Sequence, residues 1–295
     1  MAERAVVVGI DDYRDQPQNG YPNQKLKGCV HDAVDLGLFL CENRAFDKNK
    51  VRAIINPDDA TEENLRILLA WLADGAQPGD RLLFHFSGHG TQVTRNGLLQ
   101  DAICAHDFNP ITGCGVLTRA DFFRLFGGIP AGVEFICTLD SCYSGGLLWG
   151  RDNEVTRRVR SFPLPPEVAS KIEAARGRHV MRIALAETAA PLKRVLIAQA
   201  LGDDVPVPAD ADVSLNGVSV SACAANELAH EIDNGIRGHP NGEFTCRLLQ
   251  QLAAPSGLND TLAMIVTKVA RGLNDQNPQL SGSEDIKDRP WMEMP

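Results

Sequence analysis

This sequence of 295 residues lacks the motifs of several common protein classes. Its eight cysteines form no CxxC pair, which excludes a zinc ribbon and a thioredoxin-type redox motif. No Walker A or GxGxxG pattern follows the first apolar segment at residues 6–10, so a nucleotide-binding module is a weak alternative. No apolar stretch reaches the ~18 residues of a membrane-spanning helix, and the start has no signal-peptide pattern. We therefore expect a cytoplasmic protein with reduced thiols and no membrane partner.

Basic residues are too few for a protein that binds nucleic acid across its surface. The chain has 29 Lys and Arg against 38 Asp and Glu, a formal net charge of −9, and phosphate-binding proteins usually carry the opposite sign. Hydrophobic residues make up 44% of the chain, more than a disordered chain contains. A chain of this length can bury a core without disulfides or a structural metal. The composition thus indicates a globular protein with no nucleic-acid partner.

Short apolar segments alternate with helical patterns along the chain. We predict strands over residues 4–10, 51–55, 81–86, 133–139 and 218–224. We predict helices over residues 28–42, 61–73, 227–232, 244–252 and 261–273, the second with Thr61 as its N-cap. Strands that alternate with helices are typical of βαβ units. The sequence therefore predicts an α/β fold with a central, mostly parallel sheet flanked by helices.

A histidine and a cysteine each follow a predicted strand, among small residues. His89 lies in Ser-Gly-His-Gly, and Cys142 lies in Asp-Ser-Cys-Tyr-Ser-Gly-Gly. In open parallel sheets, reactive groups gather outside the carboxyl ends of the strands. A thiol needs a neighbouring base to become a nucleophile, and glycines let the backbone approach a substrate closely. Either residue alone is more often structural, but together they predict a cysteine nucleophile with a histidine partner.

Two other candidates lie inside the predicted strands and are expected to be core residues: His85 and Cys137. A zinc site made of His85, His89 and a cysteine is not expected. Histidines four residues apart share one face of a helix, whereas these two lie on a strand that runs into a loop.

Two sequence blocks resemble the active-site blocks of the metacaspases, here of the bacterial type, in the caspase-like clan of cysteine peptidases. They are residues 84–90 (FHFSGHG) and 138–145 (TLDSCYSG), with 53 positions from His89 to Cys142. Weaker similarity is found at residues 26–33 (LKGCVHDA), 241–245 (NGEFT) and 278–282 (PQLSG). The resemblance covers residues 4–146 and 216–283. It implies the caspase–haemoglobinase fold, an α/β/α sandwich.

The resemblance also implies roles for individual residues. Cys142 would attack the scissile carbonyl as a thiolate, and His89 would protonate the leaving amine and later activate water. The backbone N–H groups of Gly90 and Cys142 would form the oxyanion hole. Metacaspases cleave after Arg or Lys, and the positions that match their acidic S1 pocket are Asp32, Ser87 and Asp140, with Cys29 in its wall. Two carboxylates in a recess can bind one guanidinium through several charge-assisted bonds. Apart from the resemblance, Asp32 also fits a helix-surface carboxylate, and Asp140 fits a cap on the following turn.

The sequence departs from the metacaspase pattern in two places. Many metacaspases carry an acidic calcium-binding loop after the histidine block, but residues 91–100 contain no carboxylate, and only Asp101 and Asp107 follow. Calcium prefers 6–8 oxygen ligands with several carboxylates, so we expect no metal and no cofactor, with a calcium site as the alternative. Residues 150–216 form a basic and then acidic insertion without a matching motif. We divide the chain into a large-subunit-like core (1–149), this insertion or linker (150–216) and a small-subunit-like part (217–295) that completes the same sheet.

We predict a cysteine endopeptidase that cleaves protein substrates after Arg or Lys. Exposed loops rich in basic residues are where proteolytic nicking concentrates, so we expect a zymogen that is activated by cleavage in the 150–194 linker. The cut is made by the chain itself or by an upstream protease of similar specificity. The candidate processing sites are Arg157, Arg158, Arg160, Arg176 and Arg178. The alternative is a non-catalytic regulatory or scaffold protein with the same fold.

Overall fold

The structure is a computed structural model, and it describes residues 2–14, 25–95, 98–110, 112–142, 215–224, 227–257 and 259–292. Most of the predicted 150–216 linker and all five candidate processing arginines lie outside the described residues. The boundaries of the three predicted segments therefore stay a prediction.

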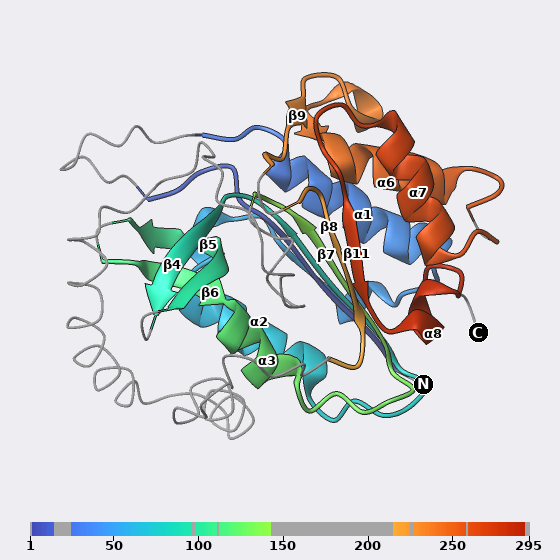
Figure 1. The fold of residues 1–295 in the computed structure, drawn as a ribbon, viewed down its shortest axis with the longest axis horizontal. Helices are drawn as coiled ribbons and strands as arrows, with labels where there is room; N and C mark the ends of the chain where they lie inside the picture. The colour runs from blue at the N-terminus through green and yellow to red at the C-terminus, as the bar shows by residue number, and fades with distance from the viewer. Residues whose placement is uncertain are drawn as a thin grey trace.

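A six-stranded sheet forms the centre of the molecule (Figure 1). Its strands, in spatial order, are β11 (Gln279–Gly282), β8 (Val218–Ser221), β7 (Glu134–Asp140), β3 (Arg81–Ser87), β1 (Glu3–Gly9) and β2 (Val51–Ile54). Every neighbouring pair is parallel except β11 and β8, which are antiparallel. The predicted α/β fold with a mostly parallel sheet is confirmed. The antiparallel edge strand β11 was not predicted, because its polar sequence carries no strand pattern.

Helices cover both faces of this sheet (Figure 1). On one face lie α1 (Cys29–Asn43), α6 (Glu243–Ala253) and α7 (Leu262–Gly272), with the short α8 (Glu284–Lys287) beside them. On the other face lie α2 (Glu62–Ala73) and α3 (Arg119–Phe126). Alternate residues of a strand point to opposite faces. Accordingly Phe84 and Phe86 pack with α2 and α3, whereas Leu83 packs with α1 and α6.

A second sheet of three antiparallel strands lies beside the carboxyl ends of the central strands (Figure 1). It comprises β4 (Gly90–Arg95), β5 (Leu98–Asn109) and β6 (Cys114–Thr118). Its own side chains form a small apolar cluster of Val93, Ala102, Cys104, Phe108 and Val116. This sheet begins directly at Gly90, so it fixes the position of the loop that carries His89.

The segment at residues 227–232 is not the helix that its apolar pattern predicts. Glu227 lies in a bend, residues 228–230 are irregular, and Glu231–Ile232 form the short strand β9, paired with β10 (Asn241–Gly242). The reason is that long-range bonds replace the local bonds of a helix. The Ala229 N–H points to Cys142 Sγ, and the Glu231 carboxylate binds backbone N–H groups at the start of α1.

Candidate active site

His89 and Cys142 lie at the same edge of the central sheet because β3 and β7 pair in register. Ser87 is the partner of Asp140, so the two following loops leave the sheet side by side. The Gly88 N–H donates to the Asp140 carbonyl oxygen at 3.2 Å. A Cβ atom at Gly90 would overlap the carbonyl oxygen of Cys142. Only glycine allows this approach, which brings the backbones of the two loops into contact.

The backbone of His89 is held on both sides. Its N–H donates to the Tyr13 hydroxyl at 2.6 Å, and its carbonyl oxygen accepts the Cys104 N–H at 2.9 Å. The Tyr13 and His89 ring centroids are 4.9 Å apart, with an angle of 37° between the rings. The imidazole is therefore packed against an aromatic ring at the edge where Cys142 lies.

Cys142 is a half-buried free thiol. Burial raises its pKa, the Asp140 charge adds to the rise, and the N–H of Ala229, 3.4 Å from Sγ, opposes it. The burial of Cys142 therefore favours the neutral thiol over the thiolate. A nucleophilic attack from this state requires a base that takes the thiol proton as the new bond forms.

Asp32 and Asp140 form a buried pair of carboxylates next to these loops. Asp32 comes from α1 and Asp140 ends β7, and both side chains face Gly242. Burial, followed by the Asp140 charge, raises the pKa of Asp32 well above its usual range. Burial also raises the pKa of Asp140 to about 6, although two hydrogen bonds from Thr245 lower it. Because like charges in one recess disfavour each other, the pair holds protons that solvent-exposed carboxyls would lose.

The hydrogen bonds to this pair come from neutral groups. Asp32 accepts from the Ser87 hydroxyl at 2.7 Å, the Asn241 amide at 2.9 Å and the Gly242 N–H at 3.0 Å. Asp140 accepts from the Thr245 N–H at 3.0 Å and its hydroxyl at 2.7 Å. Among the described residues, no cation is bonded to either carboxyl group, an arrangement that suits a positively charged ligand group.

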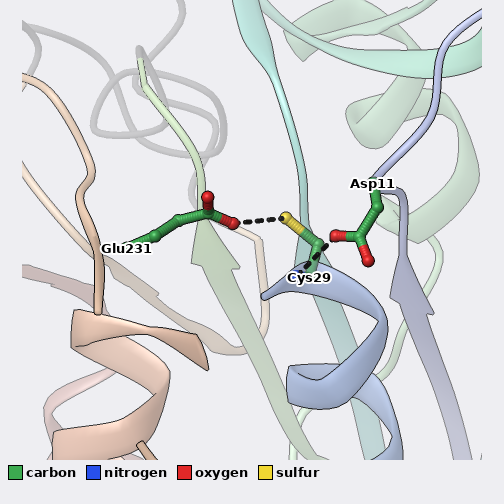
Figure 2. A group of neighbouring side chains, drawn as sticks. All are labelled: Asp11, Cys29 and Glu231. Atoms are coloured by element: carbon green, nitrogen blue, oxygen red, sulfur yellow. Dashed lines mark hydrogen bonds between the residues drawn. The ribbon is translucent and has the colours of Figure 1, made fainter. Parts of the chain in front are cut away.

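Cys29 lies between two further carboxylates at the start of α1 (Figure 2). Asp11, in the loop after β1, accepts the Cys29 N–H at 2.8 Å. Glu231 of β9 accepts the Gly28 N–H at 2.7 Å and lies 4.0 Å from the Cys29 sulfur. Burial raises the pKa of Asp11, and the N–H bonds oppose this. Both carboxylates therefore cap the positive end of α1, the helix that carries Asp32.

One atom from each of these three residues lies within 4.8 Å of the others, which is close enough to share a metal ion. However, Asp11 Oδ1 already accepts the N–H groups of Cys29 and Val30 in the first turn of α1. Glu231 Oε1 accepts the two N–H groups directly before the helix, those of Lys27 and Gly28. Helix capping explains the cluster without a metal.

The structure places the predicted catalytic, oxyanion-hole and substrate-binding residues near one another: His89, Gly90 and Cys142 where the two loops meet, and Cys29, Asp32, Ser87 and Asp140 beside them. The five predicted processing arginines lie outside the described residues. The sequence missed Tyr13, Asp11, Glu231 and Thr245. Asp11 and Tyr13 gave only the pattern of a polar loop, and Glu231 was assigned to a helix. The block at residues 241–245 stands out in the sequence as a motif, but nothing in the sequence connects Thr245 to Asp140.

The two residues predicted to be core are core. His85 and Cys137 are fully buried, and His85 Nδ1 lies 2.9 Å from the Thr138 hydroxyl. Burial lowers the pKa of His85 to about 3, so the ring is neutral. Of the two carboxylates after the histidine block, Asp101 accepts from Gln92 and Asp107 accepts the Glu62 N–H.

Comparison with known proteins places these features in a family. A sequence model described as the metacaspase, peptidase C14 domain matches residues 3–149. Metacaspase-9 from Arabidopsis thaliana is 24% identical over 330 aligned positions, which cover 99% of this chain and 97% of that protein. The chain belongs to the metacaspase family. Metacaspase-4 from Arabidopsis thaliana is 31% identical over 154 residues, 50% of this chain and 35% of that protein.

This metacaspase-family chain thus spans about a third of Metacaspase-4 but nearly all of Metacaspase-9. The matched region contains His89, Cys142, Asp32 and Asp140, whereas Glu231 and Thr245 lie outside it. Among the described residues, no helix is long and apolar enough to cross a membrane.

Solved structures show the fold. Protein GSU0716 from Geobacter sulfurreducens superposes with a TM-score of 0.65 at 22% identity, covering 100% of this chain and 99% of that one. Caspase-1 from Spodoptera frugiperda superposes with a TM-score of 0.53 at 12% identity, covering 95% of this chain and 86% of that one. The fold of this metacaspase-family chain is therefore caspase-like, as the sequence predicts.

Proposed function

We propose that the chain is a cysteine endopeptidase that cleaves protein substrates after Arg or Lys with a dyad of Cys142 and His89. One observation supports the proposal. Because Ser87 pairs with Asp140, the loops that carry His89 and Cys142 leave the sheet at one edge, directly beside the buried carboxylates Asp32 and Asp140.

The reaction would proceed in two steps. His89 takes the proton of the Cys142 thiol while the sulfur bonds to the scissile carbonyl carbon, and the carbonyl oxygen becomes an oxyanion. The N–H groups of Gly90 and Cys142 bind this oxygen. His89 then gives its proton to the leaving amine as the C–N bond breaks, which leaves a thioester. Water, deprotonated by His89, hydrolyses the thioester and restores the thiol.

The carboxylate pair provides the preference for a basic residue. A guanidinium or ammonium group that enters the recess would face Asp32 and Asp140, and its charge would favour their ionised forms. Glu231 and Asp11 add negative charge on the Cys29 side of α1. An acidic residue at this position would meet like charge and be rejected.

Activity on matched peptides tests this proposal. A fluorogenic peptide with Arg before the scissile bond is expected to be cleaved, whereas peptides with citrulline or Asp there are not. Citrulline keeps the shape of arginine without its charge, so it isolates the electrostatic contribution.

Cys142→Ala is expected to abolish this cleavage, and His89→Ala to reduce it by about 100-fold or more, which is the size of a general acid–base contribution. Cys137→Ala is the matched control, because that thiol lies in the core. Wild-type protein that folds but cleaves no peptide in the panel would favour the scaffold alternative.

The proposed reaction uses no metal ion. The carboxylates that follow His89 are engaged within the fold, Asp101 with Gln92 and Asp107 with the Glu62 N–H. Cleavage of the Arg peptide is therefore expected to continue in EGTA at the same rate. Loss of activity in EGTA that calcium restores would contradict this and would show a site with other ligands.

Activation by cleavage within residues 150–194 is part of the same proposal, with Arg157, Arg158, Arg160, Arg176 and Arg178 as candidate sites. The cut is made by the chain or by an upstream protease. All eight cysteines are free thiols, and a reducing compartment such as the cytoplasm would keep Cys142 in that form.

A further inference from the structure

Tyr13 contacts the candidate histidine in two ways. Its hydroxyl accepts the His89 N–H at 2.6 Å, and its ring lies against the imidazole with 4.9 Å between centroids. We propose that Tyr13 is a positioning residue for His89, which fixes both the backbone and the ring of the histidine for proton transfer with Cys142. The inference rests on the proposed peptidase function, because it assigns the part that orients the proposed base.

The fold holds Tyr13 in place from both sides. The Arg14 N–H donates to the His106 carbonyl oxygen at 2.9 Å, and His106 Nδ1 lies 2.8 Å from the Asp12 carbonyl oxygen. The Tyr13 ring packs against the main apolar cluster under α2 and against the small cluster of the three-stranded sheet. Tyr13 therefore joins the loop after β1 to the loop after β3.

The backbone of His89 is pinned at both its polar atoms. Tyr13 Oη binds its N–H, and the Cys104 N–H of β5 binds its carbonyl oxygen at 2.9 Å. Gly88 allows this arrangement, because a Cβ there would lie 2.7 Å from Tyr13 Oη and 2.8 Å from the Phe86 ring. The peptide at 88–89 is thus fitted against the tyrosine hydroxyl.

The chemistry of Tyr13 fits positioning rather than proton transfer. Burial raises the pKa of Tyr13 well above its usual range, so the phenol stays neutral while a histidine titrates. A neutral hydroxyl keeps accepting the His89 N–H throughout the reaction. The adjacent ring restricts rotation of the imidazole, and small errors in the placement of a base lower its rate strongly.

Tyr13→Phe tests the hydroxyl and keeps the ring. The expected result is about a ten-fold fall in kcat on the Arg peptide, the equivalent of one hydrogen bond to a part-buried donor, with KM unchanged. Tyr13→Leu removes the ring as well, so its kcat should fall further. Trp71→Phe is the matched control, since Trp71 packs against the same apolar cluster but lies on α2, away from His89.

If Tyr13 had only a structural role, its substitution would not change how the rate of Cys142 alkylation depends on pH. The rate of Cys142 alkylation by iodoacetamide, measured from pH 5 to 9, should show a shifted histidine inflection in Tyr13→Phe and an unshifted one in Trp71→Phe. This readout needs no substrate. If the alkylation rate of wild-type Cys142 shows a histidine inflection but the protein cleaves no peptide, the proposed function is contradicted and the role of Tyr13 is not. Wild-type cleavage together with unchanged kcat and alkylation profile in Tyr13→Phe would overturn the role of Tyr13.

A double-mutant cycle tests the contact itself. Gly88→Ala should lower kcat in the wild-type background, because its Cβ would push Tyr13 Oη away. In the Tyr13→Phe background the hydroxyl is gone, so Gly88→Ala should lower kcat by a smaller factor. Equal factors in both backgrounds would show that the tyrosine hydroxyl does not act on the 88–89 peptide.

Discussion

The buried carboxyl groups of Asp140 and Asp32 make the stability of the folded chain depend on pH. Burial raises the pKa of both, so the folded chain binds more protons than the unfolded chain between about pH 4 and the raised values. Stability is therefore highest below the unfolded pKa and falls as pH rises through the folded pKa. For Asp140 that folded pKa is about 6. At pH 8, above the folded pKa of Asp140, its ionised carboxylate opposes folding, which is expected where a site is built to receive a cation.

Asp140→Asn is therefore expected to stabilise the chain at pH 8 while it lowers activity. An asparagine oxygen can still accept the Thr245 bonds, and the like charge beside Asp32 is lost. The free energy of unfolding should rise by about 1–3 kcal/mol at pH 8, with a much smaller change at pH 4.5. Cleavage of the Arg peptide should fall by about 30-fold or more, as for loss of one partner in a buried charge pair. Urea unfolding at the two pH values and steady-state kinetics measure both effects.

Asp121→Asn is the control for this prediction. Asp121 is also buried, but it is paired with Arg66 at 3.0 Å, so its ionised form is compensated. The substitution should destabilise the chain at pH 8, the opposite sign to Asp140→Asn. If both variants change stability in the same direction, uncompensated charge is not the property that distinguishes Asp140.

The 227–232 segment shows at the scale of elements where sequence patterns were sufficient and where they were not. The strands around Phe84 and Leu139 carry their own apolar pattern, and their pairing placed His89 and Cys142 together as predicted. Glu231 instead takes its conformation from Gly28, 203 positions away in the sequence, and Thr245 reaches Asp140 across 105 positions. Local periodicity cannot report such contacts. The three-stranded sheet was not predicted, although its strands pair with their neighbours in the sequence.

Glu231 connects the 227–232 segment to the start of α1. Two substitutions of Glu231 should distinguish the effect of its capping hydrogen bonds from the effect of its charge. Glu231→Gln keeps an oxygen for the Lys27 and Gly28 N–H groups, whereas Glu231→Ala loses it. The alanine variant should lose about five-fold more kcat/KM on the Arg peptide than the glutamine variant, since a lost cap costs about 1 kcal/mol and frees the segment that contacts Cys142. Asp11→Asn, which alters the other cap, is the comparison. Equal losses in the two Glu231 variants would mean that its charge, not its capping bond, matters.

At the scale of the whole molecule, the chain on either side of the predicted linker forms one body. β8 pairs with β7 over Ile136–Leu139 and Val218–Ser221, and β11 extends the same sheet. Near the C-terminus, the Arg81 guanidinium donates to the Met292 carbonyl oxygen at 3.0 Å, and the Arg44 guanidinium donates to the Trp291 carbonyl oxygen at 2.9 Å. A cut between β7 and β8 would leave these contacts intact, so it can change the loops at Cys142 without separating the parts.

Cleavage in the linker is therefore expected to give two fragments that stay associated. The purified protein, once cut after an arginine in 151–194, should run as two bands on a denaturing gel but as one species of about 32.0 kDa per chain on a sizing column. Replacing every Arg and Lys in this stretch with Gln should leave one uncut chain with lower activity on the Arg peptide. Cys142→Ala, with its linker unaltered, separates the two sources of the cut, because it stays intact alone and is cut only if another protease is added. An uncut Gln-substituted chain that is as active as the processed wild type would show that the linker does not restrain the loop that carries Cys142.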